Sequence, residues 1–284
     1  MLDLLPQGLK DLLGPDLTFW VGYFTNGKHL LWYASVQYTL AAMVFGAAVA
    51  LLFGLVAAAI RNSGPPVLRW IAAGYTNIVR GVPDVLFFLF FPIAFEQGVE
   101  WVMSRQVCSA ADIAANAGTW PPCPAANWHI TTPEYLVLAS VSLGIVYGAF
   151  VANVIAGALN AVPRGQLEAA RAYGMTRFQV IWKIQVRQMW IYALPGLSNV
   201  WQSLVKATSL LSLLQIVDFV TWAQRLGAGN FSKAAGLVHE DWRWRYYLVL
   251  LVFYIGVTFV SEKVFALIGR RVRRGMPLAD QGLA

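Results

Sequence analysis

Charge is scarce in this chain. Only 12% of its 284 residues are charged and 58% are hydrophobic, whereas a soluble domain carries about 25% charged residues. The mean hydropathy of +0.57 points the same way. This shortage of charge excludes an ordinary soluble domain and predicts an all-α membrane protein with several transmembrane helices.

Long stretches without charge define the expected spans. A helix needs about 20 residues to cross roughly 30 Å of hydrocarbon. Four stretches lack charged residues altogether, and a fifth, 82–101, carries Asp84, Glu96 and Glu100 near its ends. The five expected spans are 30–60, 82–101, 135–162, 188–205 and 246–261, and they place a transmembrane domain over 30–268.

A secretory signal is also absent from the first residues. Residues 1–29 carry Asp3, Asp11 and Asp16, and no short apolar core follows a basic start. We therefore expect 1–29 to be a lead-in on the outer surface, and the first long span to be retained in the membrane.

Basic residues are few in the segments expected outside. With five spans and an outer N-terminus, 96–134 is a periplasmic loop and the basic tail 269–284 is cytoplasmic. The inner segments 61–80 and 163–187, with the C-terminal segment, hold thirteen Lys and Arg, and the outer segments hold five. Because short basic loops face the cytoplasm, we expect a periplasmic N-terminus and a cytoplasmic C-terminus. Arg270, Arg271, Arg273 and Arg274 would then lie at the anionic inner leaflet.

The chain has only two cysteines, Cys108 and Cys123, and both lie in the expected outer loop. An oxidising exterior favours a disulfide between them, and the alternative is two free thiols.

Residues that could catalyse a reaction are missing. His29, His129 and His239 are scattered without metal-ligand spacing. The stretch 22–29, GYFTNGKH, has the glycine and lysine spacing of a phosphate loop, but His29 stands where Ser or Thr should hold Mg²⁺. We expect no cofactor, metal or ATP site in this chain, so an ATP-driven function requires a separate ATPase.

A polar, basic stretch at 163–187 carries the most specific pattern. Glu168-Ala169-Ala170 is followed after three residues by Gly174, and after nine more by Ile184. Gly174 suits a helix end, and Thr176 with Gln179 three residues later suits a capping box. The pattern predicts a helix, a tight turn and a second helix.

This spacing resembles the EAA loop of ABC importer permeases, through which the membrane subunit docks on its ATPase. The flanking residues are most similar to the polar amino acid uptake branch, in particular to histidine/lysine-arginine-ornithine and octopine/nopaline permeases. Tyr75, Arg80, Gly81 and Pro83 match the entry to its second core helix. Further matches are Pro163, Gly165-Gln166, Leu194-Pro195, Asn199 and Lys206-Ala207-Thr208-Ser209-Leu210. The resemblance covers about 30–274.

The resemblance implies a type I importer fold and a set of partners. These are two ATPase subunits that bind ATP and Mg²⁺, a periplasmic solute-binding protein, and either a second copy or a sister permease. Arg80, Gly81, Pro83 and Pro195 would be structural. The coupling residues would be Gly165, Glu168, Ala169, Ala170, Gly174 and Ile184. Glu168 would pair with the ATPase, or it would merely face water.

The sequence departs from the family pattern in three places. Val186 and Arg187 replace a Leu-Pro pair, so we expect the second helix to continue straight into the membrane. Asn153 replaces an acid and Ala156 an arginine, which weakens the case that this chain itself binds a cationic side chain. The outer loop with its two cysteines is longer than usual.

Polar residues near the ends of spans are candidates for the substrate path. Lys206 contacts the pore near the outer gate, or it extends to the lipid headgroups. The remaining candidates line the path or only pack helices together. The set is Asn153, Asn199, Gln202, Lys206, Thr208 and Ser209.

The expected function is that of the membrane-spanning permease subunit of an ABC importer in the bacterial inner membrane. It would translocate polar amino acids or opine-like derivatives by alternating access. The alternative is an ion-driven secondary transporter or channel, and the absence of carboxylates from the charge-free spans counts against it. A membrane-embedded enzyme would need a paired acid, a metal cluster or an activated nucleophile. The substrate depends largely on the binding protein and is left open.

Overall fold

The computed structural model describes residues 17–128, 130–214, 216–231 and 237–273. Residues 1–16 of the expected lead-in, His129, and residues 274–284 of the basic tail lie outside this part. The chain divides into two compact units. The smaller comprises Met1–Ala41 and Leu211–Ile255, and the larger comprises Ala42–Leu210 and Gly256–Ala284. Each is described separately below.

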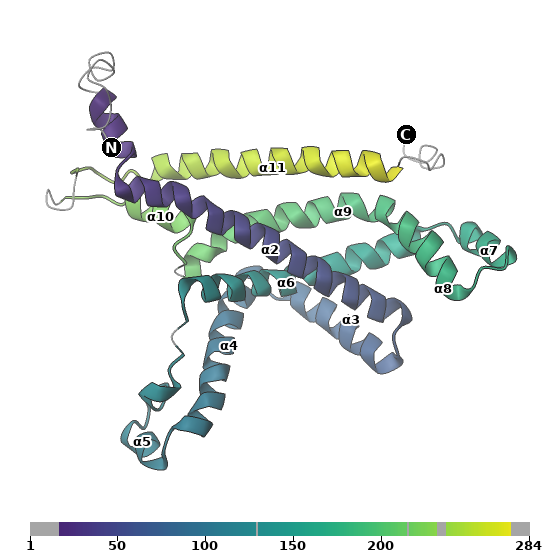
Figure 1. Cartoon of the computed structure of the whole chain (residues 1–284), viewed down its shortest axis with the longest axis horizontal. Helices are drawn as coiled ribbons and strands as arrows, with labels where there is room; N and C mark the ends of the chain where they lie inside the picture. Colours follow the sequence, from purple (N-terminus) through teal and green to yellow (C-terminus); the bar gives the residue numbers. More distant parts are fainter. Residues whose placement is uncertain (1–16, 129, 215, 232–236, 274–284) are drawn as a thin grey trace. The chain divides into compact units, whose positions relative to one another are not determined.

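The described residues are almost entirely helical (Figure 1). Residues 17–24 are helical and precede α2. The elements in order are α2 (Gly27–Ser63), α3 (Pro66–Gly81), α4 (Asp84–Val107), α5 (Ala110–Ala115), η2 (Pro124–Ala126), α6 (Thr132–Ala161), α7 (Arg164–Ala172), α8 (Arg177–Gln179), η3 (Val180–Gln185), α9 (Val186–Ala207), η4 (Thr208–Leu214), α10 (Phe219–Gly227) and α11 (Arg243–Arg273).

Four single helices are long and apolar enough to cross a membrane: Gly27–Ser63, Asp84–Val107, Pro133–Ala161 and Arg243–Arg273. Arg177–Leu214 together with Phe219–Gly227 makes a fifth candidate. The all-α membrane fold is confirmed, and each of the five expected spans falls on one of these candidates.

Two helices extend beyond the expected spans. α4 continues to Val107, so the expected outer loop 96–134 begins with three helical turns. α11 runs twelve residues past Ser261 and includes Glu262 and Lys263. Glu262 therefore belongs to a candidate membrane helix, although it lies just outside the charge-free span 246–261. The length of the charge-free stretches therefore underestimated the length of both helices. A long helix can carry single charged side chains on its surface and continue past them.

The larger unit is built on close contact between α2 and α6. A Cβ added to Gly144 would lie 2.3 Å from Val49 Cγ1, and one added to Gly54 would lie 2.3 Å from Val151 Cγ1. Each glycine therefore accepts a branched side chain of the facing helix. Small residues bring helix backbones together in the same way in other membrane proteins.

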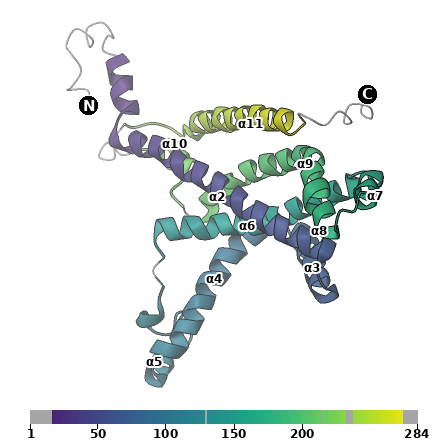
Figure 2. The ribbon, with the colours of Figure 1, turned by 45° about the vertical axis from the view of Figure 1, so that its right-hand side comes forward.

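α6 also packs against α9 in the larger unit, and the two helices lie side by side in Figures 1 and 2. A Cβ added to Gly196 of α9 would lie 2.7 Å from Val154.

From α3, the Tyr75 hydroxyl donates to the Ile145 carbonyl at 2.6 Å. Burial raises the pKa of Tyr75 to about 12, so this hydroxyl keeps its proton. From α6, the Tyr147 hydroxyl donates to Asp84 at 2.9 Å at the start of α4.

The loop 108–131 of the larger unit, expected to lie outside, folds back on α4. Glu100 is buried, with 5% of its surface exposed. Its carboxylate accepts from Trp120 Nε1 at 2.9 Å and from the Trp128 backbone N–H at 3.2 Å. Within the same loop a disulfide joins Cys108 to Cys123, and the Trp120–Pro121 peptide is cis. A buried carboxylate needs such hydrogen-bond donors. The two donors therefore explain how the Glu100 carboxylate can be buried on α4.

The smaller unit has an aromatic core around Trp32. The Trp32 and Phe219 rings stack with centroids 5.2 Å apart, and Trp32 Nε1 donates to the Phe219 carbonyl at 3.1 Å. The buried His29 ring bridges Asn26 Oδ1 at 3.0 Å and the Tyr246 hydroxyl at 2.9 Å. α10 starts at Asp218, whose carboxylate accepts from the Thr221 N–H at 2.8 Å as an N-cap.

Candidate functional site

The segment 163–187 folds as two helices joined by a tight turn. α7 begins directly after Pro163 and ends in a left-handed turn. Gly174 has φ +80°, and its N–H donates to the Arg171 carbonyl at 2.9 Å, while the Met175 N–H donates to Ala170 at 3.1 Å. This pair of bonds is a Schellman motif, in which glycine avoids the strain that a Cβ brings at positive φ.

The second helix starts with the expected capping box. The Thr176 N–H donates to Gln179 Oε1 at 3.0 Å, and the Gln179 N–H donates to Thr176 Oγ1 at 3.4 Å. From there the helix continues without a break through η3 into α9. The expected continuation past Val186 and Arg187 without a proline is thus confirmed, but the helix axis bends between α8 and α9 (Figures 1 and 2). η3 is a π-helix, in which the Val186 N–H bonds to Ile181, five residues back.

The structure separates the expected coupling residues into an exposed and a buried set. Gly165, Glu168, Ala169 and Gly174 are exposed. Ala170 is buried where α7 packs on η3, and Ile184 is half-buried within η3. The first four can therefore touch a partner directly, whereas the last two hold the two helices together.

Three large aromatic residues that the sequence patterns did not single out lie in the same segment. Tyr173 is 88% exposed, Phe178 70% and Trp182 58%. The Phe178 and Trp182 rings lie 6.0 Å apart, one helical turn from each other. Apolar groups gathered on an open surface mark interaction sites. Their presence in an otherwise basic loop was the signal that could have identified them. We call the exposed set formed by Glu168, Ala169, Tyr173, Phe178 and Trp182 the coupling surface.

Side-chain amides connect the coupling surface to the transmembrane helices. The Gln188 amide of α9 donates to Gln166 Oε1 of α7. The Gln185 amide donates to the Leu159 carbonyl of α6 at 3.3 Å. Because α7 is bonded to α9, and η3 to α6, a displacement of α7 reaches both helices through direct contacts.

Three of the candidate path residues share one face of α9. Asn199, Gln202 and Lys206 follow at intervals of three and four residues, which places them in line along a helix. Gln202 donates to Glu262 of α11 at 3.3 Å. Asn199 and Lys206 are exposed. This arrangement is a polar strip with one carboxylate, and sequence reasoning had missed Glu262.

The other candidate path residues are not part of this strip, and each has a hydrogen-bond partner within the protein. The Asn153 carbonyl oxygen accepts from Arg61 Nη1 of α2 at 2.6 Å, and the same guanidinium lies 3.4 Å from Thr76 Oγ1. Thr208 is buried, and its hydroxyl donates to the Val205 carbonyl at 2.7 Å. The Ser209 hydroxyl donates to the Lys206 backbone carbonyl at 2.8 Å. Asn153 thus joins two helices, whereas Thr208 and Ser209 bond to the backbone three residues before them, and the role of all three in the substrate path stays a prediction.

The residues of the second family motif surround the start of α4. Arg80 lies over the Phe150 ring of α6 at 5.5 Å from its centroid. Gly81 ends α3 and Pro83 is the N-cap of α4. Pro195 lies inside α9 and is exposed. Within the described residues no group of three or more His, Cys, Asp or Glu has the geometry of a metal site.

The family model for the "Binding-protein-dependent transport system inner membrane component" matches residues 13–274. The chain belongs to this family. The resemblance inferred from its motifs is confirmed, and the chain is a multi-pass inner membrane transport subunit rather than an enzyme. Permeases of this family work with ATPase and binding-protein partners.

Curated relatives of this permease transport amino acids and an opine. The octopine transport system permease protein OccQ of Rhizobium radiobacter is 30% identical over 238 residues, which cover 84% of this chain and 88% of OccQ. The histidine/lysine/arginine/ornithine transport system permease protein HisQ of Salmonella typhimurium is 32% identical over 233 residues, with coverages of 82% and 89%.

Solved structures agree with this ABC importer permease fold. A crystal structure of an amino acid ABC transporter has a TM-score of 0.61 at 22% identity and covers 85% of this chain and 94% of its own. An inward-facing MetNI methionine ABC transporter has a TM-score of 0.52 at 16% identity, with coverages of 86% and 94%.

Proposed function

We propose that this permease imports polar amino acids or opine-like derivatives, driven by ATP bound with Mg²⁺ on separate ATPase subunits. The observation that carries the proposal is the similarity to OccQ and HisQ, at 30% and 32% identity over more than four fifths of this chain. A loaded binding protein delivers the solute from outside. The permease works as a dimer, either with a second copy or with a sister chain.

The proposed orientation has the N-terminus in the periplasm and the C-terminus in the cytoplasm. The excess of Lys and Arg in 61–80, 163–187 and the C-terminal segment supports it. In this orientation α7 and α8 face the ATPase and the disulfide loop faces the periplasm.

We further propose that the coupling surface docks on the ATPase. Glu168 offers a charge to a basic partner group, and the three exposed aromatic side chains supply apolar area. Closure of the ATPase on ATP displaces α7, and the amide contacts of Gln166 and Gln185 carry the displacement to α9 and α6. The polar strip Asn199–Gln202–Lys206 on α9 is then turned toward one side of the membrane or the other. ATP drives this change because it binds the two states with different affinity.

Co-purification tests the proposed assembly directly. A tagged chain is extracted from its native membranes in a gentle detergent, and the accompanying subunits are identified by mass spectrometry. We expect an ATPase at a stoichiometric level, and a second permease if the dimer is a heterodimer. A chain that comes out alone, under conditions that preserve known ABC complexes, would instead favour an ion-driven carrier.

A further inference from the structure

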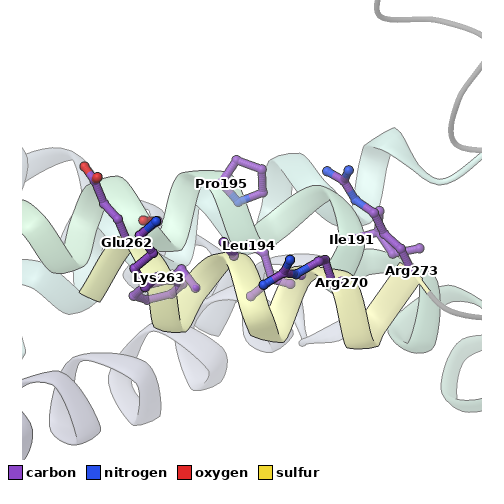
Figure 3. A pocket seen from close by; sticks show the side chains of 11 residues that line it. Ile191, Leu194, Pro195, Glu262, Lys263, Arg270 and Arg273 are labelled. Carbon is purple, nitrogen blue, oxygen red and sulfur yellow. The ribbon is translucent and has the colours of Figure 1, made fainter. Parts of the chain in front are cut away.

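A groove of about 570 Å³ runs between α9 and the C-terminal half of α11 in the larger unit (Figure 3). Its lining between the charged ends is apolar apart from the Ser198 hydroxyl, and comprises Ile191, Leu194, Pro195 and Ser198 of α9 with Phe265, Ala266 and Gly269 of α11. The volume lies within the range of about 300–1,000 Å³ typical of small-molecule sites. The middle of the groove is therefore apolar and open between two candidate membrane helices.

Charge is separated between the two ends of this groove. Arg270 and Arg273 lie at the C-terminal end of α11, and Glu262 lies at the other end (Figure 3). The helical rise puts about 12 Å between Glu262 and Arg270 and about 16 Å between Glu262 and Arg273. Glu262 accepts from Gln202, whereas within the described part of the chain neither arginine contacts a carboxylate at ion-pair distance. Lys263 lies beside Glu262, over the Phe259 ring at 5.2 Å.

We propose that this groove binds an anionic phospholipid. The phosphodiester lies between Arg270 and Arg273, and the acyl chains lie along the apolar middle of the groove. Glu262 and Lys263 offset each other at the far end, so the excess of positive charge lies at Arg270 and Arg273 and favours the phosphate at that end. A guanidinium matches phosphate through paired N–H donors and stays charged in an apolar setting.

The geometry favours a lipid over a soluble anion because the arginines close one end of an apolar groove, and a soluble anion gains nothing from the apolar part. Basic pockets between transmembrane helices bind anionic headgroups in other membrane proteins. Arg271 belongs to the same helical turn but does not line the groove. This neighbour distinguishes a specific site from general attraction to a charged membrane surface.

The first test compares charge variants of the full chain in its purified complex. The delipidated complex is titrated with phosphatidylglycerol or with phosphatidylcholine of the same acyl chains, and bound lipid is counted by native mass spectrometry. We expect R270Q and R273Q each to weaken phosphatidylglycerol binding roughly fivefold, since a cation near an anionic headgroup contributes about 1 kcal/mol. R271Q serves as the control and should bind like the unmodified chain. Equal losses in all three variants, or equal binding of both lipids, would refute the site.

The second test changes the shape of the groove and leaves its charges intact. Ala266→Trp fills the apolar middle and should reduce binding by at least tenfold, while Leu267→Trp, on the same helix outside the groove, should not. Unchanged binding in Ala266→Trp would show that only surface charge attracts the lipid, and the proposal would fail. It would also fail if soluble glycerol phosphate displaced the lipid at equal concentration, or if Ala266→Trp removed a second permease from the complex, because the groove would then be a subunit contact.

Discussion

The loops at the two ends of α6 are built on opposite principles. The loop before it, 108–131, is closed by a disulfide and by a buried carboxylate, Glu100, that accepts from two parts of the loop. The loop after it, 162–176, has neither, and is shaped by a left-handed glycine and capping hydrogen bonds next to the exposed Tyr173. The first loop is held to α4 by a covalent bond within it and by hydrogen bonds to one buried carboxylate. The second leaves side chains free for a partner, as expected of a segment that must be moved from outside.

The largest effect should come from reversing the charge on the second loop. Glu168→Lys should reduce ATP-driven uptake to background while the protein stays in the membrane, because a docking carboxylate becomes a like charge toward a basic partner. Uptake of labelled solute and ATP hydrolysis are measured together in proteoliposomes. The control is Glu240→Lys, which makes the same charge change on an exposed residue outside this loop. Normal uptake in Glu168→Lys would remove Glu168 from the coupling surface.

The next effect concerns the covalent closure of the first loop. Its cysteines are 15 residues apart, and a bridge over that length contributes about 3 kcal/mol in chain-entropy terms. Replacing Cys108 and Cys123 by serine should therefore abolish slow amide exchange in 108–131 and leave 162–176 unchanged. Before that, thiol labelling of the unmodified protein without reductant should find no free thiol. Two labelled cysteines would show that the loop is not closed in this way.

A smaller loss is expected when the charge of Glu100 is removed. Glu100→Gln keeps the shape but turns an amide toward the N–H donors of Trp120 and Trp128, at a cost of about 2 kcal/mol for hydrogen bonds to a charged acceptor. Tryptophan fluorescence and amide exchange should report loosening of the first loop. Glu96→Gln, on the same helix, is the matched control. Equal changes in both variants would mean that Glu100 does not hold the loop.

The smallest effect should follow from adding a methyl group to the turn of the second loop. Gly174 has φ +80° with open space around it, so Gly174→Ala costs only backbone strain, about 1 kcal/mol. Uptake should fall a few-fold. Gly157→Ala, at an open helical position of α6, should be neutral or slightly stabilising, since alanine favours the helix. Equal melting temperatures of the Gly174→Ala and Gly157→Ala variants in thermal denaturation would contradict this prediction.

Features governed by neighbouring residues could be predicted from the sequence. The turn at Gly174 and the capping box of Thr176 depend on residues within one helical turn, and both occur as expected. The bond between Asn153 and Arg61 joins positions 92 residues apart, so no local pattern indicates it. Glu100 was assigned near a span end because the sequence does not show that Trp120 folds back to it. The role of the coupling residues and the path residues stays a prediction until the variants are made.

The π-helical segment Val180–Gln185 affects the direction in which the side chains of α9 point. A π turn inserts one residue into the α-helical register, and each α-helical residue corresponds to a rotation of about 100°. The face that carries Asn199 and Gln202 is therefore rotated by about that angle from the direction that an uninterrupted α-helix from Arg177 would give it. The six residues of η3 thus set the direction in which the polar strip points, without any change to a residue of the strip itself.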